Sequence, residues 1–483
     1  MRSTRTTRIR FALGIGLVLL LTAACANVGD TDATEDTTAA EDDGTAADDA
    51  DVADDAVEAG EPVPEDGAML VEAEEGVEEV VFWTSHTQES DVDALTSIVE
   101  SFNAENDDLQ ISMVQVPGAE TDAAKLMTAV RGGIGPDLYL LDRFTVAERA
   151  AAGVLEPVGD HLQVNQGGDY VDFAWQEVLY DGEPYGLPFD TDVRALWYRA
   201  DLLEEAGIDF DALDPENGPP TLDEVREISD AFDEEDDSGY TRMGFVPWLE
   251  QGWHFTWGYA HGGDFFDADS CEVTPTEPGV LAAFEFMHEW AQDKGPQDMQ
   301  SFLDAYNPPE IPIPQTPIMQ GRVAMMISGE WWIALIDRYA EEDMDFRVTY
   351  VPVAEDGADP VSWSGGWSMV IPTGTENVEN AVRAMEYMAG PEGQEIYAVE
   401  SNHLPTLTAL SDVFDTEVNQ FFVDLVPHSN NRPPLPVGVQ YWDELTTAQE
   451  AVTLGQAEPA EALENVGDRV QQRLERYCPL DIS

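Results

Sequence analysis

The chain has 483 residues, of which 98 are Asp or Glu and 21 are Lys or Arg, so its formal net charge at pH 7 is -77. Nucleic-acid-binding proteins need a basic surface, and this charge excludes that class. Hydrophobic residues make up 43% of the chain, which is enough for the cores of two or three domains at this length.

The first 25 residues have the pattern of a secretory signal. Four arginines precede an apolar run from Phe11 to Leu21, and small residues then lead to Cys25. Because the run is shorter than the ~20 residues of a membrane-spanning helix, we predict a signal peptide over residues 1–24. Leu-Thr-Ala-Ala-Cys is similar to the bacterial lipobox, which implies cleavage before Cys25 and its lipidation. The alternative is an ordinary signal peptide and an unrelated cysteine.

Residues 25–79 are predicted to be a lipidated cysteine followed by a disordered linker. From Ala26 to Glu79 there are 21 acidic residues and no Lys, Arg or aromatic residue. Such a segment cannot bury enough apolar surface to offset its chain entropy. We expect a solvated spacer that reaches on the order of 40 Å from the membrane.

The rest of the chain is also acidic. It has 77 Asp and Glu against 17 Arg and Lys, and Lys125 and Lys294 are its only lysines. Because the charge is spread along the whole body, it favours a surface adapted to high salt, where counterions screen self-repulsion. A specific cationic partner is the alternative.

The body begins with strands and helices in alternation. We predict strands over 79–83, 111–116 and 136–141, and helices over 91–106 and 123–131. This order indicates an α/β fold with a parallel sheet covered on both faces. Ligands bind beyond the carboxyl ends of such strands. Ser85, His86, Asp142 and Arg143 follow two of these strands and are therefore expected beside a cleft.

A second unit is expected to begin near Asp192. Helices are predicted over 198–206, 284–290, 378–388 and 460–477, and strands over 325–328 and 348–352. Thr221 and Glu224 have the spacing of a capping box at a helix start. Residues 307–317 contain five prolines and are predicted to be a loop or a crossing between lobes.

Cysteine usage fits an exported protein. If Cys25 is lipidated, Cys271 and Cys478 remain as a pair in an oxidising compartment. We predict a disulfide between them, and two free buried thiols are the alternative. The spacings typical of metal sites are absent, so no metal or other cofactor is predicted.

Aromatic residues carry the functional signal. They form four groups beside Gly or Pro, at 248–259, 331–332, 363–367 and 441–442. One face of a pyranose is rich in C–H groups and stacks on such rings, while its hydroxyls need planar polar partners. The four groups together favour a sugar site, although any single tryptophan is equally well explained as a core residue.

The chain resembles the extracellular solute-binding proteins of bacterial ABC transporters, the group that includes maltose-binding proteins. The resemblance runs from about Val80 to the C-terminus and rests on an ordered set of short motifs. These are FWTS at 82–85, GPDL at 135–138, DRF at 142–144, YGLP at 185–188, YRADLL at 198–203, GRVAMM at 321–326, GEW at 329–331, SGGW at 364–367 and GPEG at 390–393.

The resemblance implies a two-lobed, hinged periplasmic-binding-protein-like fold of class II, with the ligand in the cleft between α/β lobes. Lobe one would comprise residues 80–188 and 321–372, and lobe two residues 190–320 and 373–483. A ligand that contacts both lobes would favour the closed state.

The resemblance also implies site residues. Asp142 and Arg143 match positions that hold sugar hydroxyls in maltose-binding proteins, and Asp192 falls where those proteins carry an acid beside the hinge. Trp331 and Trp442 fall where those proteins carry stacking tryptophans, and Gly365, Gly366 and Trp367 match a loop that borders the ligand. Trp257 belongs to a further matching segment, in which His254 stands in place of a stacking tyrosine.

The predicted function is that of a monomeric lipoprotein on the outer face of the cytoplasmic membrane. It would be exported, bind an oligosaccharide and deliver it to ABC transporter permease subunits, touching the membrane only through its anchor. One alternative is a binding partner of a chemosensory receptor. Another is a glycan hydrolase that uses Asp142 and Asp192, whose carboxylates would have to flank the scissile bond. We expect a binding protein and not an enzyme.

Overall fold

The computed structural model describes residues 67–480 except 117, 119–123 and 165–166. The predicted signal peptide, Cys25 and most of the acidic linker lie outside these residues. The linker prediction differs from the structure at its end, because β1 (Ala68–Val71) pairs antiparallel with β3 (Leu109–Gln115). Val71 packs against the core there, so this short apolar stretch forms an edge strand of the first lobe.

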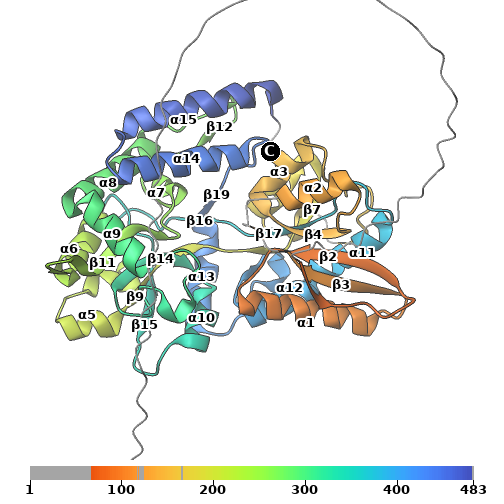
Figure 1. Ribbon diagram of the computed structural model, residues 1–483, viewed down its shortest axis with the longest axis horizontal. Coiled ribbons are helices and arrows are strands. Elements are labelled where there is room, and N and C mark those ends of the chain that lie inside the picture. The colour runs from red at the N-terminus through yellow and green to blue at the C-terminus, as the bar shows by residue number, and fades with distance from the viewer. Residues whose placement is uncertain (1–66, 117, 119–123, 165–166, 481–483) are drawn as a thin grey trace, which may run out of the picture. The chain divides into compact units, whose positions relative to one another are not determined.

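The first lobe is built on a six-stranded sheet (Figure 1). Its strand order is β1, β3, β2 (Glu78–Thr84), β4 (Leu138–Asp142), β17 (Trp367–Val370) and β7 (Gly186–Pro188). β2 is parallel to β3 and β4, as the alternation of strands and helices predicted. β17 runs antiparallel to both β4 and β7, so the sheet is mixed.

Both faces of this sheet are covered. Side chains alternate along β2, so Phe82 enters the core on one face and Trp83 the core on the other. The first face packs against α1 (Glu89–Glu105), α11 (Val378–Met388) and α12 (Pro391–Ser401). The second packs against α2 (Ala124–Gly132) and α3 (Val146–Ala151). Burial of each large apolar side chain contributes roughly 1.5–3 kcal/mol.

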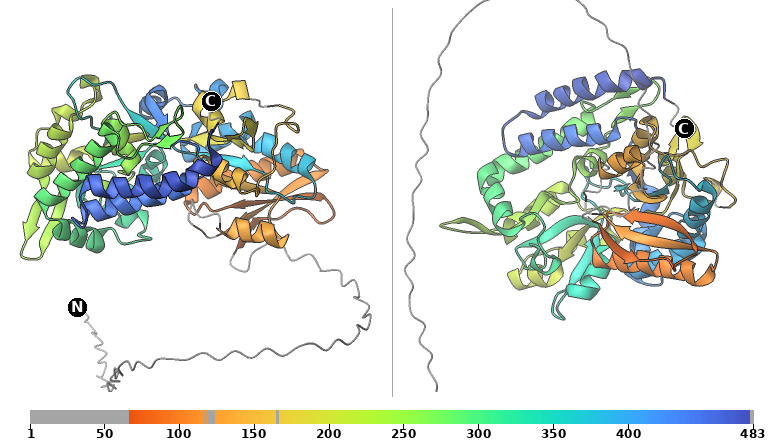
Figure 2. Two further views of the ribbon diagram at one scale, coloured as in Figure 1. Left: turned by 90° about the horizontal axis from the view of Figure 1, so that it is seen from above. Right: turned by 45° about the vertical axis from the view of Figure 1, so that its right-hand side comes forward.

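The second lobe has its own five-stranded sheet. Its order is β10 (Glu234–Asp236), β11 (Gly239–Glu250), β14 (Val323–Gly329), β9 (Arg194–Arg199) and β15 (Phe346–Thr349). Its helices are α5 (Ala200–Ala206), α6 (Leu222–Phe232), α7 (His254–Ala260), α8 (Pro278–Lys294), α9 (Pro296–Tyr306), α10 (Trp332–Tyr339), α13 (Glu417–Leu425), α14 (Gly438–Thr453) and α15 (Pro459–Leu474). The predicted capping box of Thr221 and Glu224 begins α6, and Figure 2 shows α14 and α15 side by side.

The predicted lobe boundaries differ from the structure in two places. Residues 321–372 were expected in lobe one, yet β14 and β15 belong to the second sheet and the chain returns only at β17. Residues 373–483 were expected in lobe two, but α11 and α12 bury Met385 and Tyr397 in the first lobe's core. An apolar face predicts that a strand or helix packs against a core. It does not predict which of the two sheets that core belongs to.

Hydrogen-bonded crossings connect the lobes. One crossing contains β8 (Asp190–Thr191), which pairs with β18 (Leu404–Pro405) of a second crossing. A third crossing ends at Trp367. The Trp367 backbone N–H donates to the Asp190 Oδ1 atom, and the two atoms are 2.6 Å apart. Gly366 has φ +125°, and a Cβ there would collide with the Arg143 guanidinium. These ties position the residues that lie between the lobes.

The C-terminus is fixed by a disulfide. Cys478, which follows α15, is bonded to Cys271 just before β13 (Glu272–Val273), as the sequence predicted. Within the part of the chain that the structure describes, no helix is both long and apolar enough to cross a membrane.

Candidate functional site

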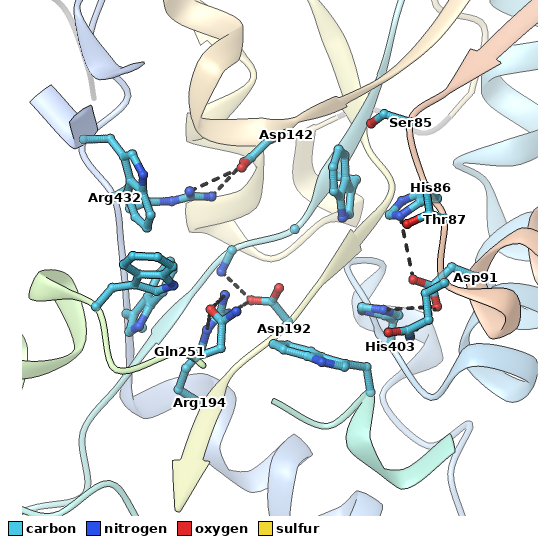
Figure 3. Close-up of a pocket in the computed structure, with 18 of the residues that line it drawn as sticks. Ser85, His86, Thr87, Asp91, Asp142, Asp192, Arg194, Gln251, His403 and Arg432 are labelled. Atoms are coloured by element: carbon cyan, nitrogen blue, oxygen red, sulfur yellow. Dashed lines mark hydrogen bonds and ion pairs between the residues drawn. The ribbon is translucent and has the colours of Figure 1, made fainter. Parts of the chain in front are cut away.

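A cavity of about 450 Å³ lies between the lobes (Figure 3). The carboxyl ends of β2 and β4 open onto it, as expected for parallel strands. It is lined by Ser85, His86, Thr87, Gln88, Asp91, Gly118 and Asp142 of the first lobe, by Asp192, Gly365, Gly366, Trp367 and His403 of the crossings, and by Arg194, Gln251, Trp253, Trp331, Trp363, Arg432 and Trp442 of the second lobe.

One wall of the cavity is an ion pair between the lobes. The Arg432 guanidinium binds both oxygens of Asp142, at 2.7 and 3.3 Å. The guanidinium also lies 3.8 Å from the centre of the Phe144 ring. Both charged side chains are less than a tenth exposed. The Asp142–Arg432 ion pair therefore links the two lobes directly across the cavity.

A second ion pair lies at the hinge. The Arg194 guanidinium binds Asp192 and donates to the Gln251 Oε1 atom at 3.0 Å. It also stacks on the Trp363 ring, 3.8 Å from its centre. The Asp192 Oδ1 atom accepts the Gly365 backbone N–H at 2.5 Å. The positive charge of Arg194 balances the negative charge of Asp192. The planar guanidinium, carboxylate and amide groups of Arg194, Asp192 and Gln251 offer directional hydrogen-bond donors and acceptors on the cavity wall.

Tryptophan rings surround these ion pairs. Trp331 follows β14 and packs its ring against Gly329, where a Cβ would collide with it. The Trp331 ring is stacked on His403, with centroids 5.9 Å apart and planes at 15°. Trp442 lies 5.4 Å from Trp253. Trp331, Trp253 and Trp442 are each partly exposed, so they present ring surface to the cavity.

A buried cluster of charges supports the hinge side of the cavity. The His403 ring lies 3.7 Å from Asp91, 3.4 Å from Asp190 and 3.7 Å from Glu330. Burial by itself would lower the pKa of His403, but the three carboxylates outweigh it and raise the pKa to about 9. Burial lowers the pKa of His86 to about 4. At neutral pH His403 is therefore a cation and His86 is neutral.

This cluster makes stability depend on pH. The folded-state pKa of His403 lies above its unfolded value of 6.5, so its contribution is complete below pH 6.5 and is lost as the pH rises to about 9. The shift corresponds to about 3 kcal/mol. We expect the free energy of unfolding from urea titrations to fall by that order between pH 6.5 and 9. His403→Gln should be less stable than the wild type at pH 6.5, because it leaves three buried carboxyl groups without their cation; equal stability of the two proteins at pH 6.5 would contradict the assignment.

Nine of the twelve predicted ligand-binding residues line the cavity. They are Ser85, His86, Asp142, Asp192, Trp331, Gly365, Gly366, Trp367 and Trp442. The other three, Arg143, His254 and Trp257, do not reach it, and each has essentially no exposed surface.

Arg143 is a structural residue at the hinge. Its guanidinium donates to Glu177 and to the Gly365 carbonyl, each at 2.5 Å, and to the Asp190 carbonyl. The chain turns into a 3-10 helix directly after Asp142. Asp142 therefore lines the cavity, while the next side chain points beneath the crossings.

His254 and Trp257 lie behind the cavity wall. Both belong to α7, and the Trp257 Nε1–H donates to the Pro247 carbonyl at 2.9 Å inside the core. The His254 ring packs edge-on against Trp442 at 4.8 Å, so it supports a ring that lines the cavity. Trp253 precedes the helix and reaches the cavity in their place. The aromatic group was identified correctly and the wrong members were chosen.

The prediction missed several cavity residues. Trp253 and Trp363 belonged to the aromatic groups already noted, and that pattern could have identified them. No local sequence pattern identifies the other missed residues, which are Asp91, Arg194, Gln251, His403 and Arg432. His403 and Arg432 come from crossing and loop segments that are distant in the sequence from the strand ends at the cavity. Within the described ranges no group of three or more His, Cys, Asp or Glu side chains is arranged to hold a metal ion.

Comparison with known proteins identifies the fold. The cavity-bearing lobes are similar to solved structures that carry sugars. CpMnBP1 with mannobiose bound has a TM-score of 0.72 and 23% identity, covering 81% of this chain and 99% of that one. The GacH receptor of Streptomyces glaucescens GLA.O, solved unliganded and with acarbose, has a TM-score of 0.68 and 24% identity, covering 83% and 99%. The two-lobed class II fold is confirmed.

Sequence comparison agrees. The maltotriose-binding protein of Pyrococcus abyssi is 24% identical over 381 residues, which are 77% of this chain and 76% of that protein. The family model of the bacterial extracellular solute-binding proteins matches residues 86–395, more than half of the chain. The chain therefore belongs to the bacterial extracellular solute-binding proteins.

Proposed function

We propose that this protein captures an oligosaccharide between its lobes and delivers it to the permease of an ABC transporter. The observation that carries the proposal is the composition of the cavity, in which partly exposed tryptophan rings lie beside two Arg–Asp pairs. Small-ligand sites combine apolar walls with a few placed polar groups in volumes of roughly 300–1,000 Å³. The cavity of about 450 Å³ fits that range.

The electrostatics favour a neutral polyhydroxylated ligand. Asp142 and Asp192 are each neutralised by an arginine, so a charged ligand would leave one charge unpaired and desolvated. A hydroxyl instead donates to a carboxylate and accepts from a guanidinium. The His86 Nε2 and Arg432 Nε atoms are buried and have no hydrogen-bond partner among the described residues. Both atoms belong to residues that line the cavity.

The relatives support a sugar ligand. The Pyrococcus abyssi relative is a maltotriose-binding protein, and CpMnBP1 was solved with mannobiose bound. The hydrolase alternative needs a carboxylic acid that donates a proton to the leaving group. Both oxygens of Asp142 are bound by Arg432, and Asp192 is bound by Arg194, so each carboxyl group is already engaged by an arginine side chain. The arrangement suits holding a saccharide and does not suit cleaving it.

We also propose that the protein acts at the outer face of the cytoplasmic membrane, lipidated at Cys25 and monomeric. Mass spectrometry of the mature N-terminus tests the lipid, and sedimentation tests the monomer.

The acidic surface is proposed as an adaptation to high salt, so the melting temperature should rise between 0.1 and 2 M NaCl. Permease genes beside this gene would favour delivery over the sensory alternative.

A thermal-shift screen tests the ligand class. The panel is maltose, maltotriose, mannobiose, mannotriose and galacto-oligosaccharides at high salt, with sorbitol, amino acids and short peptides as controls. A ligand that binds only the folded state stabilises it by mass action, by about 2.7 kcal/mol at a hundred times its Kd. We expect a rise in melting temperature with at least one saccharide and none with sorbitol. Stabilisation by amino acids or peptides alone would contradict a sugar ligand.

A further inference from the structure

A second cavity, of about 600 Å³, adjoins the first on the second lobe. It lies between the end of β11, α9 and the loop that follows α9. Gln251 and Trp253 line both cavities. The two cavities are therefore neighbours, and these two side chains lie at the boundary between them.

The shared residues are tied to the first cavity. The Gln251 Oε1 atom accepts from Arg194 at 3.0 Å, and Arg194 holds Asp192 at the hinge. The Trp253 ring lies 5.4 Å from Trp442, with planes at 57°. The Trp442 and Trp253 rings are therefore neighbours, and Trp253 lies at the boundary between the cavities.

The wall beyond the boundary repeats the chemistry of the cleft. Trp248, Leu249 and Glu250 lie at the end of β11 and all line the second cavity, and Leu249 is nearly buried between the other two. Trp248 is partly exposed and lines the second cavity. Gln300 and Asn307 add amide groups on the opposite side. An aromatic platform, a carboxyl group and amides are the groups that bind a pyranose.

Glu250 marks this wall as unusual. Its backbone has φ +56°, a left-handed conformation that costs about 1 kcal/mol or more outside glycine and often marks a functional site. Its carboxyl group has no hydrogen-bond or ion-pair partner among the described residues, and burial raises its pKa to about 7. A half-buried carboxyl group without a partner is available to a ligand hydroxyl.

We propose that this second cavity is a further carbohydrate subsite, in which Trp248 stacks the sugar units of a linear oligosaccharide that extend past Trp253. The inference rests on the proposed function and adds to it a preference for chains longer than the cleft alone holds. Trp253 contacts both parts of the ligand, and Trp248 contacts only the distal part.

Calorimetric titration of chain-length series tests the subsite. The probes are maltose to maltohexaose and mannobiose to mannohexaose, with the wild type, Trp248→Ala, Trp248→Phe and Trp253→Ala. In the series that binds, we expect the hexasaccharide to bind the wild type about tenfold more tightly than the disaccharide. Trp248→Ala should abolish this gain and leave disaccharide affinity unchanged, Trp248→Phe should retain most of it, and Trp253→Ala should weaken binding of both lengths.

Other outcomes overturn the inference. If affinity does not rise with length, or if Trp248→Ala keeps the full gain, the second cavity binds no sugar while the proposed function stands. If Trp248→Ala weakens disaccharide and hexasaccharide equally, Trp248 acts on the cleft and not on a distal subsite. If neither series binds and the thermal screen also fails, the proposed function and the inference fall together.

Discussion

Replacing Trp331 by alanine should weaken sugar binding at least tenfold. The Trp331 ring is stacked on the His403 ring, with centroids 5.9 Å apart, and the Arg194 guanidinium lies 5.3 Å from its centre. These contacts fix the ring, and its partly exposed surface lines the cavity, so little further side-chain freedom is lost on binding. Tenfold corresponds to about 1.4 kcal/mol, close to the ~0.5–1.5 kcal/mol of an aromatic contact beyond its buried area. Calorimetry with the best saccharide of the thermal screen measures the loss.

The adjacent tryptophan provides a matched control. Trp332 begins α10 and is 1% exposed in the second lobe's core. Trp332→Phe should lower the unfolding free energy and leave the Kd within about twofold, while Trp331→Phe should keep most of the affinity because it keeps a ring. Unchanged affinity in Trp331→Ala would show that this ring is a packing residue and does not contact the ligand.

Arg143→Ala should cost about 3–5 kcal/mol of stability, the range observed when one partner of a buried ion pair is removed. Arg143 and Glu177 are both fully buried, and their atoms are 2.5 Å apart. The same guanidinium donates to the carbonyls of Asp190 and Gly365 in two crossings. Its loss leaves the buried Glu177 carboxylate and the Asp190 carbonyl without this donor, and the Gly365 carbonyl keeps only the Thr191 hydroxyl at 3.3 Å. Urea unfolding of the two proteins measures the difference.

A second substitution separates charge from packing. Arg143→Ala combined with Glu177→Gln removes the uncompensated carboxylate, so it should recover part of the lost stability. Arg143→Lys keeps the charge but not the planar fork that reaches three acceptors, so it should fall between the wild type and Arg143→Ala. A variant Arg143→Ala that folds with wild-type stability but binds no sugar would instead restore this residue to the ligand contacts.

Local structure was largely predictable from the sequence. The apolar pattern of 79–83 and 111–116 identified β2 and β3, the helix predicted over 378–388 is α11, and the Thr221–Glu224 capping box begins α6. Each of these signals acts through neighbouring residues, by periodic burial or by a cap. The disulfide was predicted from cysteine number and compartment.

The site was predictable where strand ends determine it. Ser85, His86 and Asp142 follow parallel strands, and that geometry places them at one edge of the sheet. Which of two adjacent side chains faces the cleft depends on the turn that follows, so Asp142 and Arg143 could not be separated. For the same reason, the sequence analysis chose Trp257 as a cavity residue, although Trp253 is the one that lines the cavity.

The sequence by itself determined that the chain is an acidic α/β protein with a sugar-binding composition, because burial, caps and charge are properties of short segments. Only the tertiary structure decided that β14 belongs to the second sheet, that α11 and α12 cover the first, and that Arg432 reaches Asp142. The physical reason is that apolar faces and charged groups have no intrinsic preference among distant partners. Their pairing follows from how the crossings fold the whole chain.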